Sequence, residues 1–533
     1  MATGSIWNAD LGNGNYRNPI LYADYSDPDA IRVGENYFMI ASSFGNAPGL
    51  PLLHSKDLVN WKVVNYIIDE IPEERYKDPI HGCGVWAPAI RYHEGTYYVC
   101  FPMPDEGIYM STATDPFGKW SKPVNIRPGA GWIDPCPFWD DDGKAYLVAG
   151  VAKSRIGYKS VLHMVELQPD GMGLIGEEHK VFDGNENDQV TIEGPKMYKK
   201  NGWYYIFAPA GGVKTGWQTV LRSRNVFGPY EYKIVMRQGD TSVNGPHQGA
   251  WVDTATGEDW FLHFQDVYGA GRITHLQPMS WHEDWPVIGI AKEGNDYGEP
   301  VMEYRKPDVG GVKCCVCEPE TSDDFKGNQL GLQWQWNANP QKDWYELTGD
   351  NLKLNAVHRV TVYGDMPNLL LQKWPAPEFT CLTKLDLSHL AEGDEAGVIS
   401  MGVSYGLVTF EKNGDRLVPS FVTGEQKYGK ILPETTVETR HALAELDWSQ
   451  AKELHVRYTV KRAGTQDLSS SEKGFPLELV TFEYSTDGAV YQKAGEMHAV
   501  PGRWVGVKNG VFCASRNTAG KGYAIAVDVQ YER

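Results

Sequence analysis

The chain has 533 residues, of which 41% are hydrophobic and 22% are charged, and its formal net charge is −19. This length favours two domains, and the composition is typical of a globular protein. The negative charge argues against nucleic acid as a partner, because phosphate binding requires clustered Lys and Arg. No apolar run is long enough to span a bilayer, so a membrane partner is not expected either. The oligomeric state stays open.

The first residues, MATGSIWNADLGNGNYRNP, lack the basic region and apolar core of a signal peptide. The protein is therefore expected to be cytoplasmic, or secreted or periplasmic with its signal removed. Aromatic residues are frequent, with 18 Trp and 29 Tyr. This content favours strands and surfaces that stack on flat ligands such as sugar rings.

A short apolar strand, a turn and an aromatic strand recur five times in the first 300 residues. The units begin DPDAIRVGENYF, WAPAIRYHEGTYY, DPCPFWDDDGKAYL, EGPKMYKKNGWYYI and HQGAWVDTATGEDWFL, and they start at Asp27, Trp86, Asp134, Glu193 and His247. Five such units of about fifty residues predict a five-bladed β-propeller over residues 1–305. Five unrelated hairpins in a sandwich is the alternative, which the common order, spacing and turn type disfavour.

The repeat stops near residue 300. The stretch over residues 306–320 contains Gly and Pro without periodicity and is interpreted as a linker. Residues 321–533 then alternate apolar and polar side chains over short runs separated by turn residues, which predicts a β-sandwich domain. The fold class is therefore all-β.

In a propeller the first strand of each blade lines the central channel, so the five unit starts should meet at one channel end. A Pro at the start of such a strand is tolerated, because no ladder N–H is needed there. Three of the converging residues are carboxylic acids, namely Asp27, Asp134 and Glu193. Two acids can serve as general base and general acid in bond hydrolysis, and a third can raise the pKa of a neighbour. A structural role would instead require cationic partners or a metal.

These motifs resemble those of the family 43 glycoside hydrolases, in particular the β-xylosidase and α-L-arabinofuranosidase group with its concanavalin-like second domain. NPILYADYSDPDAIR, WIDPCPFWDDDGK and TIEGPKMY are similar to the family's three acidic motifs, and LGLQWQWNANP to the opening of its second domain. The resemblance implies that Asp27 is the general base, Asp134 the pKa modulator and Glu193 the general acid.

The same resemblance implies the substrate-binding residues. Three motifs are similar to family motifs that line the sugar, namely GVWAPAIRY, NGPHQGAWV and GRITHLQPMSW. The family also places one aromatic residue beside the base and one aromatic residue from the sandwich at the site. The implied residues are Trp86, Ala87, Phe44, Arg272, His247 and Phe512. The family often holds a calcium ion near the channel His, mostly through water, so calcium is the expected cofactor near His247.

The implied function is an exo-acting, inverting glycosidase that releases terminal xylose or L-arabinofuranose from xylo-oligosaccharides or arabinose-substituted fragments. One pocket can accept both sugars, because their hydroxyl groups are similar. Two alternatives remain: an arabinan-degrading hydrolase of the same family, and a non-catalytic carbohydrate-binding propeller. The sucrose- and fructan-cleaving propellers are disfavoured, because their Asn-Asp-Pro-Asn and Arg-Asp-Pro motifs are absent from the sequence.

Overall fold

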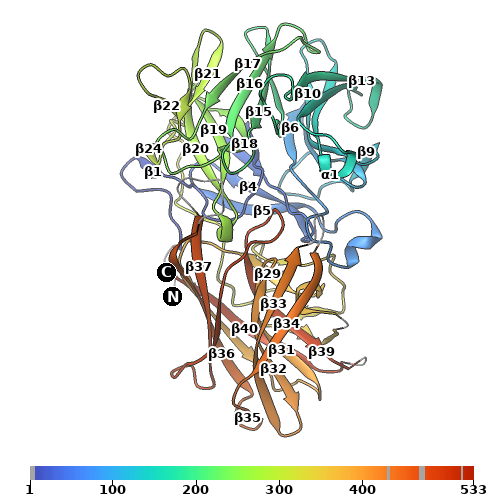
Figure 1. Cartoon of the computed structure of the whole chain (residues 1–533), viewed down its shortest axis with the longest axis vertical. Helices are drawn as coiled ribbons and strands as arrows, with labels where there is room; N and C mark the ends of the chain where they lie inside the picture. Colours follow the sequence, from blue (N-terminus) through green and yellow to red (C-terminus); the bar gives the residue numbers. More distant parts are fainter. Residues whose placement is uncertain (1–5, 360, 429–432, 467–474, 518–519) are drawn as a thin grey trace.

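Alternating strands dominate the computed structural model, which describes residues 6–359, 361–428, 433–466, 475–517 and 520–533. The predicted fold class is confirmed: five four-stranded blades form a propeller, and two larger sheets form a sandwich (Figure 1). Helix in these ranges is limited to α1 (Lys153–Ile156) and three 3₁₀ turns, η1 (Glu74–Lys77), η2 (Tyr268–Ala270) and η3 (Tyr363–Asp365). None of the described helices is long and apolar enough to cross a membrane.

Each blade is an antiparallel meander in chain order. Blade 1 contains β2 (Asp29–Val33), β3 (Asn36–Ile40), β4 (Gly49–Ser55) and β5 (Trp61–Ile68). Blade 2 contains β6 (Ala89–His93), β7 (Thr96–Met103), β8 (Gly107–Ala113) and β9 (Val124–Pro128). Blade 3 contains β10 (Trp132–Trp139), β11 (Ala145–Val151), β12 (Val161–Leu167) and β13 (Leu174–Asp183).

Blade 4 contains β14 (Lys196–Lys200), β15 (Trp203–Ala210), β16 (Trp217–Ser223) and β17 (Glu231–Met236), and β22 (Ile290–Ala291) and β23 (Gly298–Glu299) extend its outer edge. Blade 5 contains β18 (His247–Asp253), β19 (Asp259–Asp266), β20 (Arg272–His282) and β21 (Trp285–Ile288). The pair β1 (Asn15–Arg17) and β24 (Glu303–Arg305) joins the two ends of the propeller segment.

The first strand of each blade is innermost. Strand β2 lies between β18 and β6, and β10 lies between β6 and β14, so these strands surround the axis. The unit starts therefore gather at one end of the channel, as the repeat predicts. Two of the acids have left-handed backbone, with φ of 55° at Asp27 and 56° at Asp134. Asp tolerates this region better than most residues, and such strained positions are common at functional sites.

The Asp-Pro at 134–135 differs from the expected strand opening. It lies inside β10, where Ile133 pairs with Gly150 and Cys136 pairs with Val148. Asp134 and Pro135 together therefore face one residue of β11, which is a β-bulge. A bulge leaves a residue outside the ladder, so the missing N–H of Pro135 costs nothing there and the Asp134 side chain turns toward the channel end.

The sandwich consists of two sheets. One has the order β25 (Gln335–Trp336), β29 (Leu370–Lys373), β39 (Lys508–Ser515), β31 (Asp394–Met401), β32 (Tyr405–Asn413), β33 (Arg416–Tyr428) and β34 (Pro433–Ala442), with β28 (Val357–His358) and β35 (Leu446–Asp447) at its sides. The other has the order β26 (Tyr345–Leu347), β27 (Leu352–Asn355), β40 (Tyr523–Glu532), β30 (Phe379–Asp386), β36 (Glu453–Gln466), β37 (Phe475–Ser485) and β38 (Gln492–His498).

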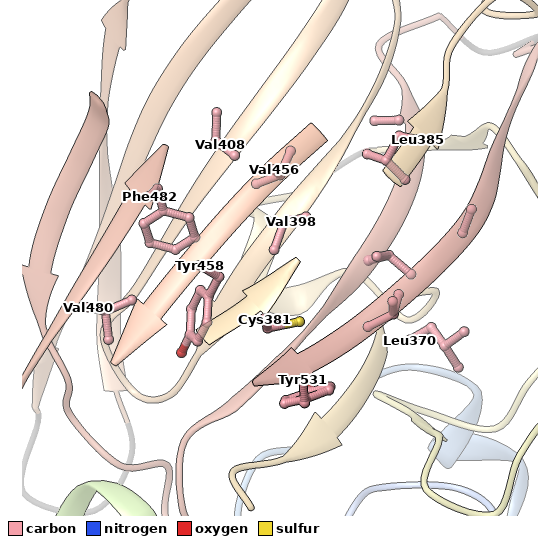
Figure 2. Close-up of a cluster of buried hydrophobic side chains, with 14 of the residues drawn as sticks. Leu370, Cys381, Leu385, Val398, Val408, Val456, Tyr458, Val480, Phe482 and Tyr531 are labelled. Atoms are coloured by element: carbon pink, nitrogen blue, oxygen red, sulfur yellow. The ribbon is translucent and has the colours of Figure 1, made fainter. Parts of the chain in front are cut away.

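The inner faces of these sheets form the main sandwich core (Figure 2). Val398 and Val408 from one sheet face Val456, Tyr458 and Phe482 from the other, and each of these side chains is buried. This core follows from the period-two alternation of the sequence, because alternate side chains of a strand point to the same face.

The two domains are joined by hydrogen bonds as well as by apolar contact. Trp336 of the sandwich and Ala47 of blade 1 exchange backbone hydrogen bonds, with N···O distances of 2.6 and 3.1 Å. Gln335 Nε2 donates to Pro48 O at 2.8 Å, and Tyr66 Oη donates to Leu332 O at 2.9 Å. The sandwich is therefore fixed against the end of blade 1 that carries Asp27 and Phe44.

Candidate active site

Asp27 is almost completely buried at the entry to β2. Its Oδ2 accepts hydrogen bonds from Ser26 Oγ at 2.7 Å and Ser42 Oγ at 2.8 Å, and its Oδ1 accepts one from Arg272 Nη1 at 3.0 Å. Three donors from three parts of the propeller therefore fix the orientation of this carboxylate. The two serines were not identified from the sequence; Ser42 follows an apolar strand directly, and that position is the only signal for it.

Asp134 is held by groups from blades 4 and 5. Its Oδ2 accepts hydrogen bonds from the backbone N–H of Gly194 at 2.8 Å and from Gln248 Nε2 at 3.2 Å. Gln248 occupies a second bulge in β18, because His247 pairs with Phe264 and Gly249 pairs with His263, which leaves Gln248 without a partner in the ladder. Its φ is 36°. The bulge turns the amide of Gln248 toward Asp134, a contact that the linear pattern does not show.

Glu193 lies before β14 and is the most open of the three acids, with 26% of its side chain exposed. Its Oε1 lies 2.8 Å from Nε2 of His247, which is completely buried. Glu193 thus faces solvent on one side and is positioned by His247 on the other. A general acid requires both features, because it must reach the substrate and keep a fixed direction.

The three carboxylates interact electrostatically. Burial raises the pKa of Asp134 to about 8, and the charges of Glu193 and Asp27 add to this rise, while Lys196 and the Gly194 N–H oppose it. The sequence assigned the retained proton to Glu193. The raised pKa belongs to Asp134, whose side chain is almost fully buried.

Arg272 connects the base to the second domain. Besides Asp27, its side chain contacts Ser26 Oγ at 2.9 Å, and its backbone N–H donates to Asp24 Oδ1 at 2.9 Å. The other oxygen of Asp24 accepts from the backbone N–H of Gly506 in the sandwich, at 2.9 Å. Burial of Arg272 lowers its pKa, but the negative charges of the surrounding carboxylates raise it by more. These carboxylates are Asp27, Asp266, Asp24 and Glu193. The net pKa of Arg272 therefore lies above its ordinary value, and the guanidinium stays charged.

Aromatic rings line the approach to these acids. The rings of Phe44 and Trp86 are 6.2 Å apart, and Trp504 of the sandwich meets Trp86 edge to face at 6.4 Å. The Arg272 guanidinium lies 5.7 Å from the Trp504 ring. Trp504 is 44% exposed and has a φ of 68°. In the sequence it stands between two glycines, in GRWVG, a pattern too common to mark a site residue.

Arg155 supports Trp86 from behind. Its guanidinium lies 5.0 Å from the Trp86 ring and forms an ion pair with Asp105, with a shortest N···O distance of 3.0 Å. Trp86 Nε1 donates to Gly82 O at 3.2 Å. The Trp86 ring is therefore fixed by a cation and by a hydrogen bond.

The other predicted substrate-binding residues are less accessible. Ala87 and Phe44 are nearly fully buried, and His247 has no exposed surface and contacts Glu193 instead of a ligand position. The expectation for Phe512 is wrong: it lies in β39 with no exposed surface and packs on Tyr363, with ring centroids 5.6 Å apart. Trp504, eight residues earlier, is the sandwich residue at the site.

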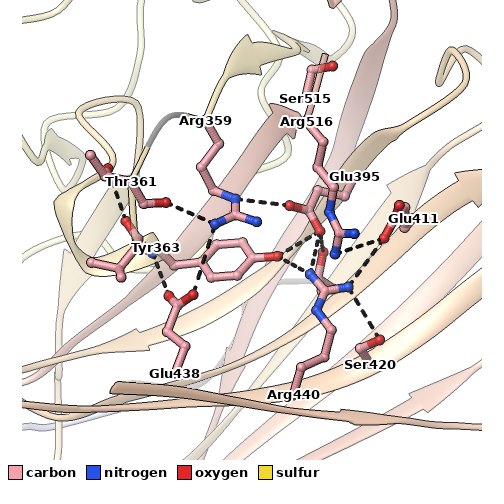
Figure 3. Close-up of polar contacts among 12 residues, drawn as sticks. Arg359, Thr361, Tyr363, Glu395, Glu411, Ser420, Glu438, Arg440, Ser515 and Arg516 are labelled. Carbon is pink, nitrogen blue, oxygen red and sulfur yellow. Dashed lines mark hydrogen bonds and ion pairs between the residues drawn. The ribbon is translucent and has the colours of Figure 1, made fainter. Parts of the chain in front are cut away.

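The segment that packs on Phe512 through Tyr363 is held in place by a polar network. Figure 3 shows this network. Glu395 is fully buried and accepts hydrogen bonds from Tyr363 Oη at 2.6 Å and Arg440 Nη2 at 2.9 Å, and it also contacts Arg359 Nε at 3.3 Å. Arg440 also donates to Tyr363 Oη. Because Arg359 and Tyr363 belong to one segment, the network holds that segment over the sheet face that carries Phe512.

A separate cavity of about 690 Å³ opens at the opposite end of the channel. It is lined by the distal ends of the five first strands, including Arg32, His93, Trp139, Lys200 and Asp253. Asp27 and Glu193 precede β2 and β14, and Asp134 lies near the start of β10. The two channel ends are therefore distinct, and the candidate chemistry belongs to the end that contacts the sandwich.

The donors near His247 fit water better than a directly bound calcium ion. His247 Nδ1 is buried without a hydrogen-bond partner among the described atoms. Calcium prefers oxygen ligands, and within the described ranges no group of three or more His, Cys, Asp or Glu is arranged to hold a metal. A buried water satisfies such a nitrogen.

Comparisons with known proteins agree with this architecture. Residues 16–286 match the family description "Glycosyl hydrolases family 43", and residues 322–532 match "Beta xylosidase C-terminal Concanavalin A-like domain". A putative beta-xylosidase of Xylanibacter ruminicola is 38% identical over 509 residues, which cover 94% of this chain and 86% of that protein.

A non-reducing end alpha-L-arabinofuranosidase of Bacteroides ovatus is 30% identical over 514 residues, which cover 88% of this chain and 91% of that protein. Among solved structures, a bifunctional GH43-CE protein of Bacteroides eggerthii superposes with a TM-score of 0.80 at 28% identity. The superposition covers 97% of this chain, and this chain spans 63% of that longer one.

Proposed function

Because this chain belongs to the glycosyl hydrolases of family 43, we propose that it is an exo-acting, inverting glycosidase that releases terminal xylose or L-arabinofuranose. The substrates would be xylo-oligosaccharides and arabinose-substituted fragments of xylan. Membership of this family makes the chain a glycoside hydrolase that acts on oligosaccharides.

One observation carries the mechanism: two differently held carboxylates come from blades that are not neighbours in the ring. Asp27 enters blade 1 and is fixed by Arg272 and two serines, whereas Glu193 enters blade 4 and is partly exposed. In the proposed reaction Asp27 removes a proton from water while Glu193 protonates the leaving oxygen. Inversion requires a spacing of roughly 6.5–9.5 Å between such a pair, so that the water fits beneath the sugar.

The exo mode is supported by Trp504. It reaches over the propeller from the sandwich and meets Trp86 edge to face, so it closes one side of the approach to the acids. An endo-acting hydrolase needs an open groove on both sides of the cleaved bond. The two sugars are proposed together because one similar protein is named as a beta-xylosidase and another as an arabinofuranosidase.

The test is a paired assay with 4-nitrophenyl β-D-xyloside and 4-nitrophenyl α-L-arabinofuranoside, with proton NMR of the first sugar released from xylobiose. We expect activity on at least one glycoside and an inverted anomer. Glu193→Gln and Asp27→Asn should each lower kcat/KM by at least about a hundredfold, the low end for a positioned acid or base. Glu177→Gln, on the exposed outer strand β13, is the control and should be unaffected.

A retained anomer would exclude the proposed roles of Asp27 and Glu193. Cleavage of linear arabinan in mid-chain, without release of single sugars, would favour the arabinan-degrading alternative. Loss of activity in Glu177→Gln equal to that in Glu193→Gln would show that the variants act through folding.

A further inference from the structure

Two lysines lie directly opposite each other where the sandwich meets the propeller. Lys373 of β29 and Lys508 of β39 are cross-strand partners in an antiparallel pair. Side chains in such a pair stand close together on one face, so two ammonium groups there repel each other. Lys508 is only 4% exposed, which makes the repulsion stronger than at a surface.

The ammonium group of Lys373 has two neighbours that stabilise it. Its Nζ donates to Gln335 Oε1 at 3.1 Å and lies 5.6 Å from the ring of Tyr25. Lys508 has no such partner: in the part of the chain that the structure describes, only the charges of Lys373 and Asp24 act on it, and no hydrogen bond to it is found. A buried amine has three hydrogens to satisfy when charged, and leaving them unpaired is costly.

A single carboxylate, that of Asp24, acts electrostatically on both lysines. The charge of Asp24 stabilises Lys373 and Lys508 alike, but its two oxygens already accept the backbone N–H groups of Arg272 and Gly506. His81, which lines the same cavity as Lys508, lies with its Nε2 3.2 Å from Asp365 Oδ1. Burial and the charge of Lys373 lower the pKa of Lys508 to about 7, so Lys508 is charged in about half of the molecules at neutral pH and in most of them below it.

Lys508 also lines a cavity. The cavity encloses about 60 Å³ between the domains, and its other walls include Phe44, Gly82, Met401 and Arg503. A single water needs roughly 10–15 Å³ by this measure, so the space admits a small ion with some water. Met401 is the partner of Lys508 on its other side, in β31, so apolar and cationic groups face the cavity together.

We propose that this interdomain cavity is a binding site for a halide-sized monovalent anion, held by the ammonium group of Lys508 next to Lys373. The anion compensates the second buried positive charge that Asp24 leaves unpaired. The site is separate from the three acids, yet it shares Phe44 and Gly82 with the aromatic side of the catalytic end. Occupancy stabilises the docking of the two domains, because an anion that binds only the folded state favours that state.

The first test is thermal unfolding at pH 6.5 with sodium chloride from 0 to 200 mM, with sodium gluconate keeping the ionic strength constant. Gluconate is a bulky organic anion and serves here as the non-halide counter-ion. We expect a saturable rise in Tm of at least about 2 °C for the wild-type protein. Lys508→Met should abolish the rise, and the exposed-lysine control Lys122→Met should keep it.

Without chloride, Lys508→Met should melt above the wild-type protein, because it removes an uncompensated buried charge. With saturating chloride this difference should shrink. A chloride response that is absent from the wild-type protein, or equal in Lys508→Met, overturns the proposal.

The second test needs no variant and decides the question if Lys508→Met does not fold. Crystals of the wild-type protein are soaked in sodium bromide and measured at the bromine absorption edge. An anomalous peak within hydrogen-bonding distance of Lys508 Nζ is expected. Ordered bromide elsewhere on the protein, with none in this cavity, overturns the proposal.

Discussion

Asp134 shows how strongly the surroundings can act on a single residue of the site. Its backbone is held in a left-handed bulge, its side chain is buried, and two further carboxylates act on it. Because its pKa is raised from an ordinary 3.8 to about 8, the folded protein holds a proton there that the unfolded chain loses. Asp134 therefore lowers the stability of the folded protein progressively as pH rises between these two values.

The variant Asp134→Asn keeps the shape and removes the negative charge that Asp134 gains as pH rises toward about 8, a charge that opposes a second negative charge beside Glu193. We expect the basic limb of the pH profile of kcat/KM to move to lower pH by about one unit, equivalent to about 1.4 kcal/mol. A 4-nitrophenyl substrate, which needs little protonation, should lose less rate than xylobiose. The exposed Asp188→Asn serves as control. An unmoved basic limb, with equal losses on both substrates, would leave Asp134 only a structural role.

At the scale of elements, the loop that precedes β39 decides what the sandwich contributes to the site. Gly506 lies against Gly271, where a side chain on either glycine would meet the other's backbone. Val507 N donates to Gly269 O at 2.8 Å, and Gly506 N donates to Asp24. These contacts fix the loop on blade 5 and hold Trp504 over Trp86 and Arg272.

The variant Trp504→Ala should weaken binding of the substrate more than it changes the chemical step. We expect kcat/KM on xylotriose to fall about tenfold, mainly through KM, because one edge-to-face ring contact and its covered apolar area are lost. Tyr232→Ala, an exposed aromatic on the outer strand β17, is the matched control. A fall in kcat with unchanged KM would instead give Trp504 a part in the reaction itself.

At the scale of the whole molecule, the two domains are joined by paired backbone groups. The bridge between Ala47 and Trp336 adds the sandwich to blade 1, and Trp336 is 2% exposed. The N-terminal segment also crosses the junction: the N–H groups of Ile6 and Trp7 donate to the Glu318 carboxylate, each at 2.9 Å. Separating the domains would leave these buried groups unpaired, which is costly.

We therefore expect the chain to unfold in one cooperative transition, even though its length would allow two. Differential scanning calorimetry should give one peak, and near-UV and far-UV circular dichroism should lose their signals at the same temperature. Glu395→Gln, inside the sandwich and away from the junction, should lower that single Tm without splitting the peak. Two resolved peaks in the wild-type protein would show that the domains unfold independently.

The repeat of strand, turn and aromatic strand in the sequence determined the propeller. The alternation of apolar and polar residues determined the sandwich. Both are local patterns that can be recognised from the sequence alone. The acids at 27, 134 and 193 could be found the same way, since they occupy equivalent places in the repeat. Only the tertiary structure showed that Trp504, and not Phe512, reaches the site. It alone showed that His247 serves Glu193 and that Lys508 faces Lys373. These outcomes depend on how two domains dock and on bulges that turn single side chains, and contacts across hundreds of residues leave no periodic trace in a sequence.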